Sequence, residues 1–360
     1  MCSIYTYGGI AATKDDFFGW FYGWGFVTDP RILAVESLTY FEKNKTYPIK
    51  KIELALKTLG PENKKFCTFL IMETLRKRLL IDNILSEYLR KPGNIPKFIL
   101  NVLRVGVTQI LFMDTVPGYA AVSEMVELVK VRKFRGLVNA VLRKISRNPF
   151  KVEDMPDYLQ YAHPRWLYEY FLKHPYIDDV ESLLMFNQNP PLHTVSPEYK
   201  HILDTEGYIY SESDYSDCLL IIEKPENTEN IEHVDELKYC LKQIIDIPII
   251  KPKTTELGRI NEKPWLLHSL SESDFMESKN KILSFLRSSD LPKQFIFLSD
   301  TLSLEENTYV VKELNNCKGV NLEETLKERN IDSRYDGYGN WLVLPETPRP
   351  AYVSYIKRSD

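Results

Sequence analysis

The chain has 360 residues, of which 44% are hydrophobic and 27% charged, the balance of a soluble globular protein with two or three domains. No apolar run reaches the roughly 18–20 residues that cross a bilayer, so the sequence excludes transmembrane helices. The five cysteines include no Cys-x-x-Cys pair. This argues against a disulfide framework and a structural zinc site, and predicts a cytoplasmic protein without a bound metal.

The net charge of −4 is unevenly distributed along the chain. Residues 31–150 contain 22 lysines and arginines against 10 acidic residues, a balance of +12. Residues 151–360 contain 23 basic against 37 acidic residues, a balance of −14. A basic segment attracts a polyanion that an acidic segment repels, so the first half is the candidate for a nucleic-acid contact.

Residues 1–30 form an aromatic N-terminal extension whose core, residues 17–26, reads FFGWFYGWGF. This segment is too short to span a bilayer and lacks the basic start and small-residue cleavage site of a signal peptide. It fits either a contact surface for a partner or a loosely ordered extension, and the sequence assigns it no function.

Residues 31–150 are helical almost throughout. Apolar residues recur there at three- and four-residue spacing, the pattern of helices that pack one face against a core. Three such stripes are Ile99, Val102, Leu103 and Ile110; Val122, Met125, Val126 and Val129; and Val138, Val141, Leu142 and Ile145. Proline and glycine at 60–61, 91–93 and 116–118 mark helix ends. The sequence predicts an all-helical domain of five to seven helices.

The pattern changes after residue 150. Residues 151–192 are a proline-punctuated connector with a helical stretch from Trp166 to Leu184. From residue 193 to 360, short apolar strands alternate with helices, which predicts an α/β domain. The predicted strands are 207–210, 218–222, 244–250, 294–298, 341–344 and 351–356, and the predicted helices are 234–245 and 304–315.

Residues 103–149 and the HPRWL sequence at 163–167 carry recognisable motifs. The motif residues are Leu103, Arg104, Gly106, Gln109, Leu111, Phe112, Asp114, Pro117, Ala120, Ala121, Val122, Glu124 and the block from Val138 to Arg143. Over residues 31–190 they resemble the NusB-like amino-terminal domain of the RsmB (Sun/Fmu) ribosomal RNA cytosine-5 methyltransferases. The resemblance implies a multidomain protein, all-α then α/β, in which a NusB-like RNA-binding domain precedes a reduced Rossmann-like methyltransferase remnant.

Two motifs of the family's catalytic half are also present in altered form. Residues 246–249 resemble the family's Asp-Ala-Pro-Cys motif, with Ile249 at the cysteine position. Glu305-Glu306-Asn307 resembles the end of its second cysteine motif and places Asp300 at the position of the catalytic cysteine. The reaction needs a thiolate that adds to carbon-6 of cytosine, and neither replacement supplies one. The sequence therefore predicts no catalytic residues.

The family's S-adenosylmethionine loop is rich in glycine and opens a helix, and no such loop follows residue 150. The one Gly-x-Gly, at 337–339, precedes a terminal strand and predicts a turn. About fifty residues separate Thr194 from Asp246, whereas each strand–helix–strand unit needs about 30. We therefore expect that the cofactor-binding half of the fold is deleted and that no cofactor binds.

The predicted helix 132–147 carries the best candidate site. Arg135, Asn139, Arg143 and Arg147 recur every four residues, opposite the apolar stripe. The candidate RNA-binding residues are Arg132, Lys133, Arg135, Asn139, Arg143, Lys144 and Arg147. The alternatives are a merely solvated basic face and, for Asn139, a buried capping role. A second basic cluster, 76–78, is better explained as an ordinary helix surface.

Three functions compete. The favoured one is an inactive, RsmB-like protein that binds RNA, most simply ribosomal RNA. The second is an active rRNA cytosine-5 methyltransferase that uses another thiol, for which Cys240 and Cys317 are the nearby candidates. The third is a transcription-antitermination or protein-interaction module, in which the acidic second half contacts a protein partner.

Overall fold

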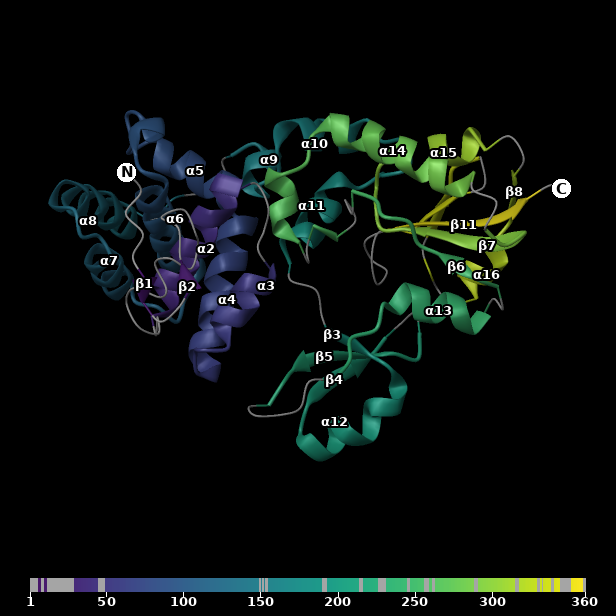
Figure 1. Ribbon diagram of the computed structural model, residues 1–360, viewed down its shortest axis with the longest axis horizontal. Helices are drawn as coiled ribbons and strands as arrows, with labels where there is room; N and C mark the ends of the chain where they lie inside the picture. The colour runs from purple at the N-terminus through teal and green to yellow at the C-terminus, as the bar shows by residue number, and fades with distance from the viewer. Residues whose placement is uncertain are drawn as a thin grey trace. The chain divides into compact units, whose positions relative to one another are not determined.

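The protein, as a computed structural model, is described at residues 6–7, 10–11, 29–44, 49–148, 150, 152, 155–189, 193–213, 216–225, 231–244, 247–255, 259–260, 263–287, 291–314, 317–328, 331, 333–337, 340–343 and 351–358. The aromatic segment 17–26 and Asp246 lie outside these residues. Within them, no helix is long and apolar enough to cross a membrane. The chain divides into two compact units, Met1–Pro164 and Arg165–Asp360 (Figure 1). The finer division at residues 30, 150 and 192 stays a prediction.

In its described residues the first unit is helical apart from a pair of two-residue antiparallel strands, β1 (Thr6–Tyr7) and β2 (Ile10–Ala11). Its helices are α2 (Pro30–Asn44), α3 (Ile49–Leu56), α4 (Pro61–Arg76), α5 (Arg78–Ser86), α6 (Lys97–Phe112), α7 (Gly118–Glu127), α8 (Arg132–Arg147) and the short α9 (Asp157–Gln160). A 3-10 turn spans Pro92–Asn94. The described part of 30–147 thus contains seven α-helices, and α4 and α7 begin at the expected breaks.

Helix α6 is the centre of this unit. Its residues from Asn101 to Gln109 are all buried, and it contacts α2, α4, α5, α7 and α8. Gly106 permits the approach of α8, because a Cβ built there would lie 2.6 Å from Leu142 Cδ1. Ile99, Val102 and Leu103 of the expected stripe are buried, whereas Ile110 is only half-buried.

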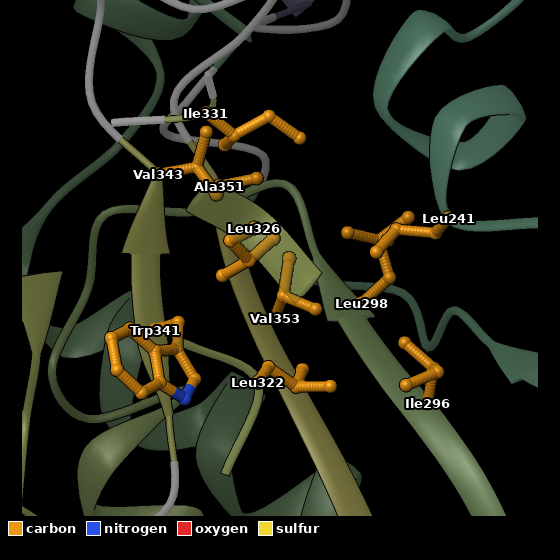
Figure 2. Close-up of a cluster of buried hydrophobic side chains, with 10 residues drawn as sticks. All are labelled: Leu241, Ile296, Leu298, Leu322, Leu326, Ile331, Trp341, Val343, Ala351 and Val353. Atoms are coloured by element: carbon orange, nitrogen blue, oxygen red, sulfur yellow. The ribbon is translucent and has the colours of Figure 1, made fainter. Parts of the chain in front are cut away.

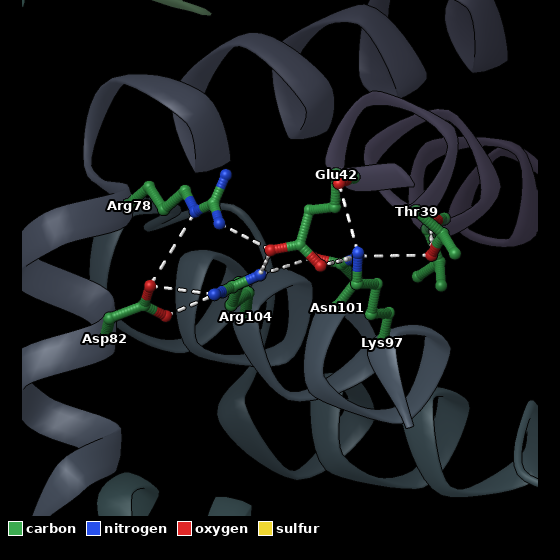
Figure 3. Close-up of polar contacts among 8 residues, drawn as sticks. Thr39, Glu42, Arg78, Asp82, Lys97, Asn101 and Arg104 are labelled. Atoms are coloured by element: carbon green, nitrogen blue, oxygen red, sulfur yellow. Dashed lines mark hydrogen bonds and ion pairs between the residues drawn. The ribbon is translucent and has the colours of Figure 1, made fainter. Parts of the chain in front are cut away.

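A buried ion network joins α2, α5 and α6 (Figure 3). The Arg104 guanidinium donates to Asp82 through Nε at 2.6 Å and through a second nitrogen at 2.8 Å. It also donates to Glu42 Oε1 at 2.7 Å, and Arg78 pairs with the same carboxylate. Asn101 lies within the network and accepts from Arg104 at 2.9 Å. Removing one member would leave charge uncompensated inside the unit.

The expectation that residues 76–78 form an ordinary helix surface is wrong. Arg76 is only 3% exposed and pairs with Glu73 at 2.7 Å. Arg78 belongs to the buried network, and burial lowers the pKa of Lys77, whose ammonium lies 5.9 Å from the centre of the Phe112 ring. These cations are paired or covered within the fold and are unsuited to bind a polyanion.

Burial also perturbs an acid on α2. One carboxylate oxygen of Glu36 is inaccessible and has no hydrogen-bond partner among the described residues, and burial raises the pKa to about 7. Between pH 4.5 and about 7 the folded state therefore holds a proton that the unfolded chain has released, so the free energy of unfolding falls as the pH rises.

We expect Glu36→Gln to remove this pH dependence. The variant should gain about 3 kcal/mol over the wild type at about pH 8 but only about 1 kcal/mol at about pH 5, where the wild-type carboxyl is neutral in the folded state and only partly ionised in the unfolded chain. Urea unfolding of both proteins at both pH values measures the difference between their free energies of unfolding. The contributions of other titrating groups are common to both proteins and cancel in this difference. An equal difference at the two pH values would contradict the assignment.

The second unit begins with helices α10 (Arg165–Leu172) and α11 (Val180–Gln188). An antiparallel sheet follows in the order β3 (His193–Val195), β5 (Leu219–Glu223), β4 (Ile209–Glu212), with α12 (Lys200–Glu206) contributing Leu203 to its core. The predicted strand 207–210 begins two residues later, because Gly207 ends α12 with a left-handed φ of 76°.

A six-stranded sheet forms the rest of the unit. Its order is β6 (Ile249–Ile250), β7 (Gln294–Ser299), β11 (Ala351–Arg358), β10 (Trp341–Val343) and β9 (Ser333–Tyr335), and β8 (Cys317–Val320) also pairs with β11. β6 and β7 are parallel, and the remaining pairs are antiparallel. Between β9 and β10, Gly337 has a positive φ of 79°, as a turn requires, while residues 338–339 lie outside the described part.

Helices cover both faces of this sheet. Along β7, Ile296 and Leu298 face the cluster drawn in Figure 2, which includes Leu241 of α13 (Glu236–Ile244) and Leu326 of α16 (Glu323–Lys327). Phe295 and Phe297 face α14 (Glu272–Leu286) and α15 (Thr308–Lys312), and a 3-10 helix spans Pro264–His268. The fold class is confirmed: an all-helical first part and an α/β second part.

Two predicted elements are shorter than expected. Of the strand 244–250, the described residues form a strand only at Ile249–Ile250, because α13 continues through Ile244. Of the helix 304–315, the described residues 304–314 are α-helical only at Thr308–Lys312. Residues 304–307 instead form a turn, and within it the buried Glu306 side chain accepts hydrogen bonds from Thr255 and Thr301.

Candidate nucleic-acid interface

Helix α8 separates an apolar face from a basic one. Val138, Val141, Leu142 and Ile145, the four residues of the expected packing stripe, are buried. The other face is exposed over four turns. The apolar stripe fixes the rotation of α8 against α6 and α7, so the position of the basic residues follows from the packing.

The structure brings the seven predicted site residues together on this helix. Arg132, Lys133, Arg135, Arg143, Lys144 and Arg147 are all exposed. Asn139 is half-buried in the middle of the helix, so the alternative of a capping role is wrong. Whether these side chains contact RNA stays a prediction.

The six cations have no neutralising partner in the part of the chain that the structure describes. α8 contains no acidic residue, and none of the six forms an ion pair within the described ranges; Lys133 lies 5.6 Å from the centre of the Phe134 ring. Arg132 and Lys133 occupy the first turn, where the helix dipole disfavours positive charge. Repeated cations at four-residue spacing also repel one another. The face therefore carries positive charge at a cost to helix stability, in contrast to the paired Arg78 and Arg104.

The two cysteine positions of the family resemblance lie at neighbouring strands in the second unit. Ile249 pairs with Ile296 in the parallel register of β6 and β7 and packs against the hydrophobic cluster. Asp300, which follows β7 directly, is only 3% exposed. Its Oδ2 lies 2.8 Å from Lys251 Nζ and 3.7 Å from an Arg259 nitrogen. Asp300 is a carboxylate held by two cations, which is a poor nucleophile.

The loop after Asp300 is fixed by hydrogen bonds to Glu306. Its carboxylate accepts from the Thr255 backbone N–H at 2.7 Å, from the Thr301 hydroxyl at 2.8 Å, and from the Thr255 and Ser278 hydroxyls. Burial raises the pKa of Glu306. The adjacent Glu305 accepts from Tyr170 Oη at 2.9 Å. The sequence placed Glu305-Glu306-Asn307 in a family motif, and the structure gives Glu305 and Glu306 an anchoring role.

The order of the strands shows where a cofactor could bind relative to the edges of the sheet. In the described sheet β6 is an edge strand, and β9 is the edge strand at the other end of the order. A cavity of about 530 Å³ lies at the β9 end and is lined by residues that include Arg334, Tyr335 and Trp341. This cavity is therefore separate from the carboxyl ends of β6 and β7, where Lys251 and Asp300 meet.

The alternative thiols proposed from the sequence, Cys240 and Cys317, stay a prediction. Cys240 lies in α13 and Cys317 begins β8, but both side chains lie outside the described set. Of the described cysteines, Cys218 is buried and its pKa is raised by burial. Cys67 is buried in the first unit, and burial raises its pKa to about 12. Both described thiols are protonated near neutral pH and are unsuited to nucleophilic attack.

Comparisons with known proteins find similar sequences over the first part of the chain. Residues 28–147 match the NusB family. The probable ribosomal RNA small subunit methyltransferase B of Bacillus subtilis is 27% identical over 179 residues, which cover 47% of this chain and 40% of the relative. The corresponding protein of Synechocystis sp. is 31% identical over 175 residues, 45% of this chain and 39% of the relative. This chain thus spans about two-fifths of the length of these methyltransferase relatives.

Two further comparisons concern the first part and the fold. The transcription antitermination protein NusB of an Exiguobacterium species is 30% identical over 127 residues, which cover 33% of this chain and 95% of that protein. The solved structure titled "Crystal Structure of PH0851" covers 91% of this chain and 99% of its own, with a TM-score of 0.65 and 15% identity. At that identity the likeness shows a shared fold alone.

Proposed function

This chain belongs to the NusB family through residues 28–147 and is RsmB-like with a NusB-like amino-terminal part, and from that premise we propose that it binds RNA and does not transfer methyl groups. The observation that carries the proposal is the basic face of α8, with six exposed cations and no ion-pair partner among the described residues. Phosphate contacts compensate such charge and release counterions. Ribosomal RNA is the proposed target, since the relatives' names specify it.

The residues at the former catalytic positions support the proposed inactivity. Ile249 can neither donate nor accept a proton. The Asp300 carboxylate forms ion pairs with Lys251 and Arg259. Cytosine-5 chemistry needs a thiolate at this place. A carboxylate already paired with two cations supplies neither the nucleophile nor a free base.

The residues present do not fit S-adenosylmethionine either. In an open α/β sheet such a ligand binds at the carboxyl ends of the strands, where the strand order reverses and strands lie on both sides. β6 is the edge of the described sheet, and its carboxyl end leads to Lys251, which is paired with Asp235 and Asp300. We derive no reaction step through this cofactor.

Three measurements on the same protein sample test the proposal. Gel shifts with ribosomal RNA fragments should show binding at low ionic strength that weakens at high ionic strength. Calorimetry with S-adenosylmethionine should show no heat of binding, and tritiated methyl groups should not enter the RNA. An RNA affinity that does not depend on the salt concentration would contradict the phosphate contact. Micromolar cofactor affinity would contradict the inactivity and favour the active methyltransferase.

The likeness to NusB over 95% of that relative favours a second candidate, a transcription-antitermination or protein-interaction module. In that case the acidic second half is the proposed surface for a protein partner. For either function the cytoplasm is the proposed location. An apolar protein interface differs from a phosphate contact in its weak salt dependence, so the same gel-shift series separates the two functions.

A further inference from the structure

Helix α7 begins beside the end of the basic face. Residues 128–131 connect α7 to α8, and Gly118 at the start of α7 lies against Ser146 in the last turn of α8. A Cβ built at Gly118 would lie 2.6 Å from Ser146 Oγ. The two helices therefore run antiparallel, and the first turn of α7 lies at the end of α8 that carries Arg143, Lys144 and Arg147.

Tyr119, the next residue, is exposed in this position. Its side chain is 80% exposed, and among the described residues it has no hydrogen-bond, ionic or ring partner. The apolar side of α7, with Ala121, Val122 and Met125, is buried elsewhere on the helix. The Tyr119 ring thus contributes little to the core, although a single exposed aromatic residue is by itself ordinary.

The neighbouring cations give this ring a chemical role. On the premise of the proposed function, we infer that Tyr119 is a base-stacking residue and that the α7–α8 surface takes single-stranded RNA. Surfaces for single strands combine cations that contact the backbone with aromatic rings on which bases stack. Here Arg143, Lys144 and Arg147 supply the charge and Tyr119 supplies the ring.

The Tyr119 ring should contribute to the binding of single-stranded RNA but not of double-stranded RNA. In a duplex the base faces are covered by their neighbours, and a protein contacts mainly phosphates and 2′-hydroxyl groups. An unpaired base offers its face to Tyr119 while its phosphate contacts the cations. The surface should therefore bind a single strand more tightly than a duplex of the same sequence, and the difference should depend on the aromatic ring.

The test compares Tyr119→Ala with Tyr119→Phe in the full chain. Fluorescence anisotropy would measure binding to a labelled single-stranded oligoribonucleotide and to its duplex. Tyr119→Ala should weaken single-strand binding on the order of tenfold, leave duplex binding unchanged and keep the salt dependence. Tyr119→Phe should retain wild-type affinity because it keeps the ring. Phe69→Ala, a change at a 40%-exposed ring on α4, is the control and should have no effect.

The possible failures are distinguishable. If Tyr119→Ala binds the single strand as the wild type does while a charge reversal on α8 weakens binding, the stacking role is wrong and RNA binding stands. Equal losses for single strand and duplex would also overturn the stacking role. If the wild type binds neither RNA, the proposed function itself is wrong.

Discussion

Replacing Arg104 with Met is expected to lower the free energy of unfolding by about 3 kcal/mol or more. The change keeps the length of the side chain but removes the cation that bridges Glu42 and Asp82. Glu42 is only 9% exposed and would keep Arg78 as its cationic partner, while Asp82 would lose its charge-assisted hydrogen bonds at 2.6 and 2.8 Å. Urea unfolding measures the loss.

Arg143→Met is the matched control, because Arg143 is exposed and makes no ion pair among the described residues. It should change the free energy of unfolding by no more than about 0.5 kcal/mol. The double variant Glu42→Gln/Arg104→Met should lose less than the sum of its single changes, since the two residues act as a unit. An Arg104→Met loss equal to that of Arg143→Met would contradict the structural role of the network.

Reversing charge at Arg143 and Arg147 is expected to weaken RNA binding by at least about tenfold at low ionic strength. The double variant Arg143→Glu/Arg147→Glu removes two cations from the face and adds two anions, which repel phosphate. Neither side chain packs in the core, so the variant should fold, and circular dichroism would confirm this.

Lys64→Glu/Lys65→Glu is the control for net charge. It makes the same change in charge at two exposed positions on α4, away from the basic face of α8. Compared at an ionic strength of about 0.15 M, it should weaken binding much less than the α8 variant. The Debye length is then about 8 Å, so a long-range attraction is screened and only a local contact depends on these positions. Equal losses in the two double variants would mean that net charge, and not α8, governs binding.

The sequence predicted α8 well because a helix with a four-residue apolar stripe has one way to pack. Val138 and Leu142 fix which side of the helix is covered, and exposure of Arg135, Arg143 and Arg147 follows from the helical repeat. The cluster at 76–78 was misjudged because Arg78 pairs with Glu42, 36 residues away in the chain. Local periodicity contains no information on such a partner.

The second unit was less predictable for the same reason. The short strands β8 and β9 carry little alternation of their own and depend on pairing with β11 and β10. Lys251, the partner of Asp300, was missed because their contact exists only once β6 and β7 lie side by side. α14 was also missed, although the Ser271–Asp274 capping box at its start is a readable signal.

The salt dependence of RNA binding by the wild type and by Arg143→Glu/Arg147→Glu tests the central claim most directly. The logarithm of the association constant, plotted against the logarithm of the salt concentration, should fall linearly for the wild type. The slope of the double variant should be shallower by about one to two units, since two phosphate contacts are lost. Identical slopes, or a wild-type affinity that salt does not change, would contradict an RNA contact through α8.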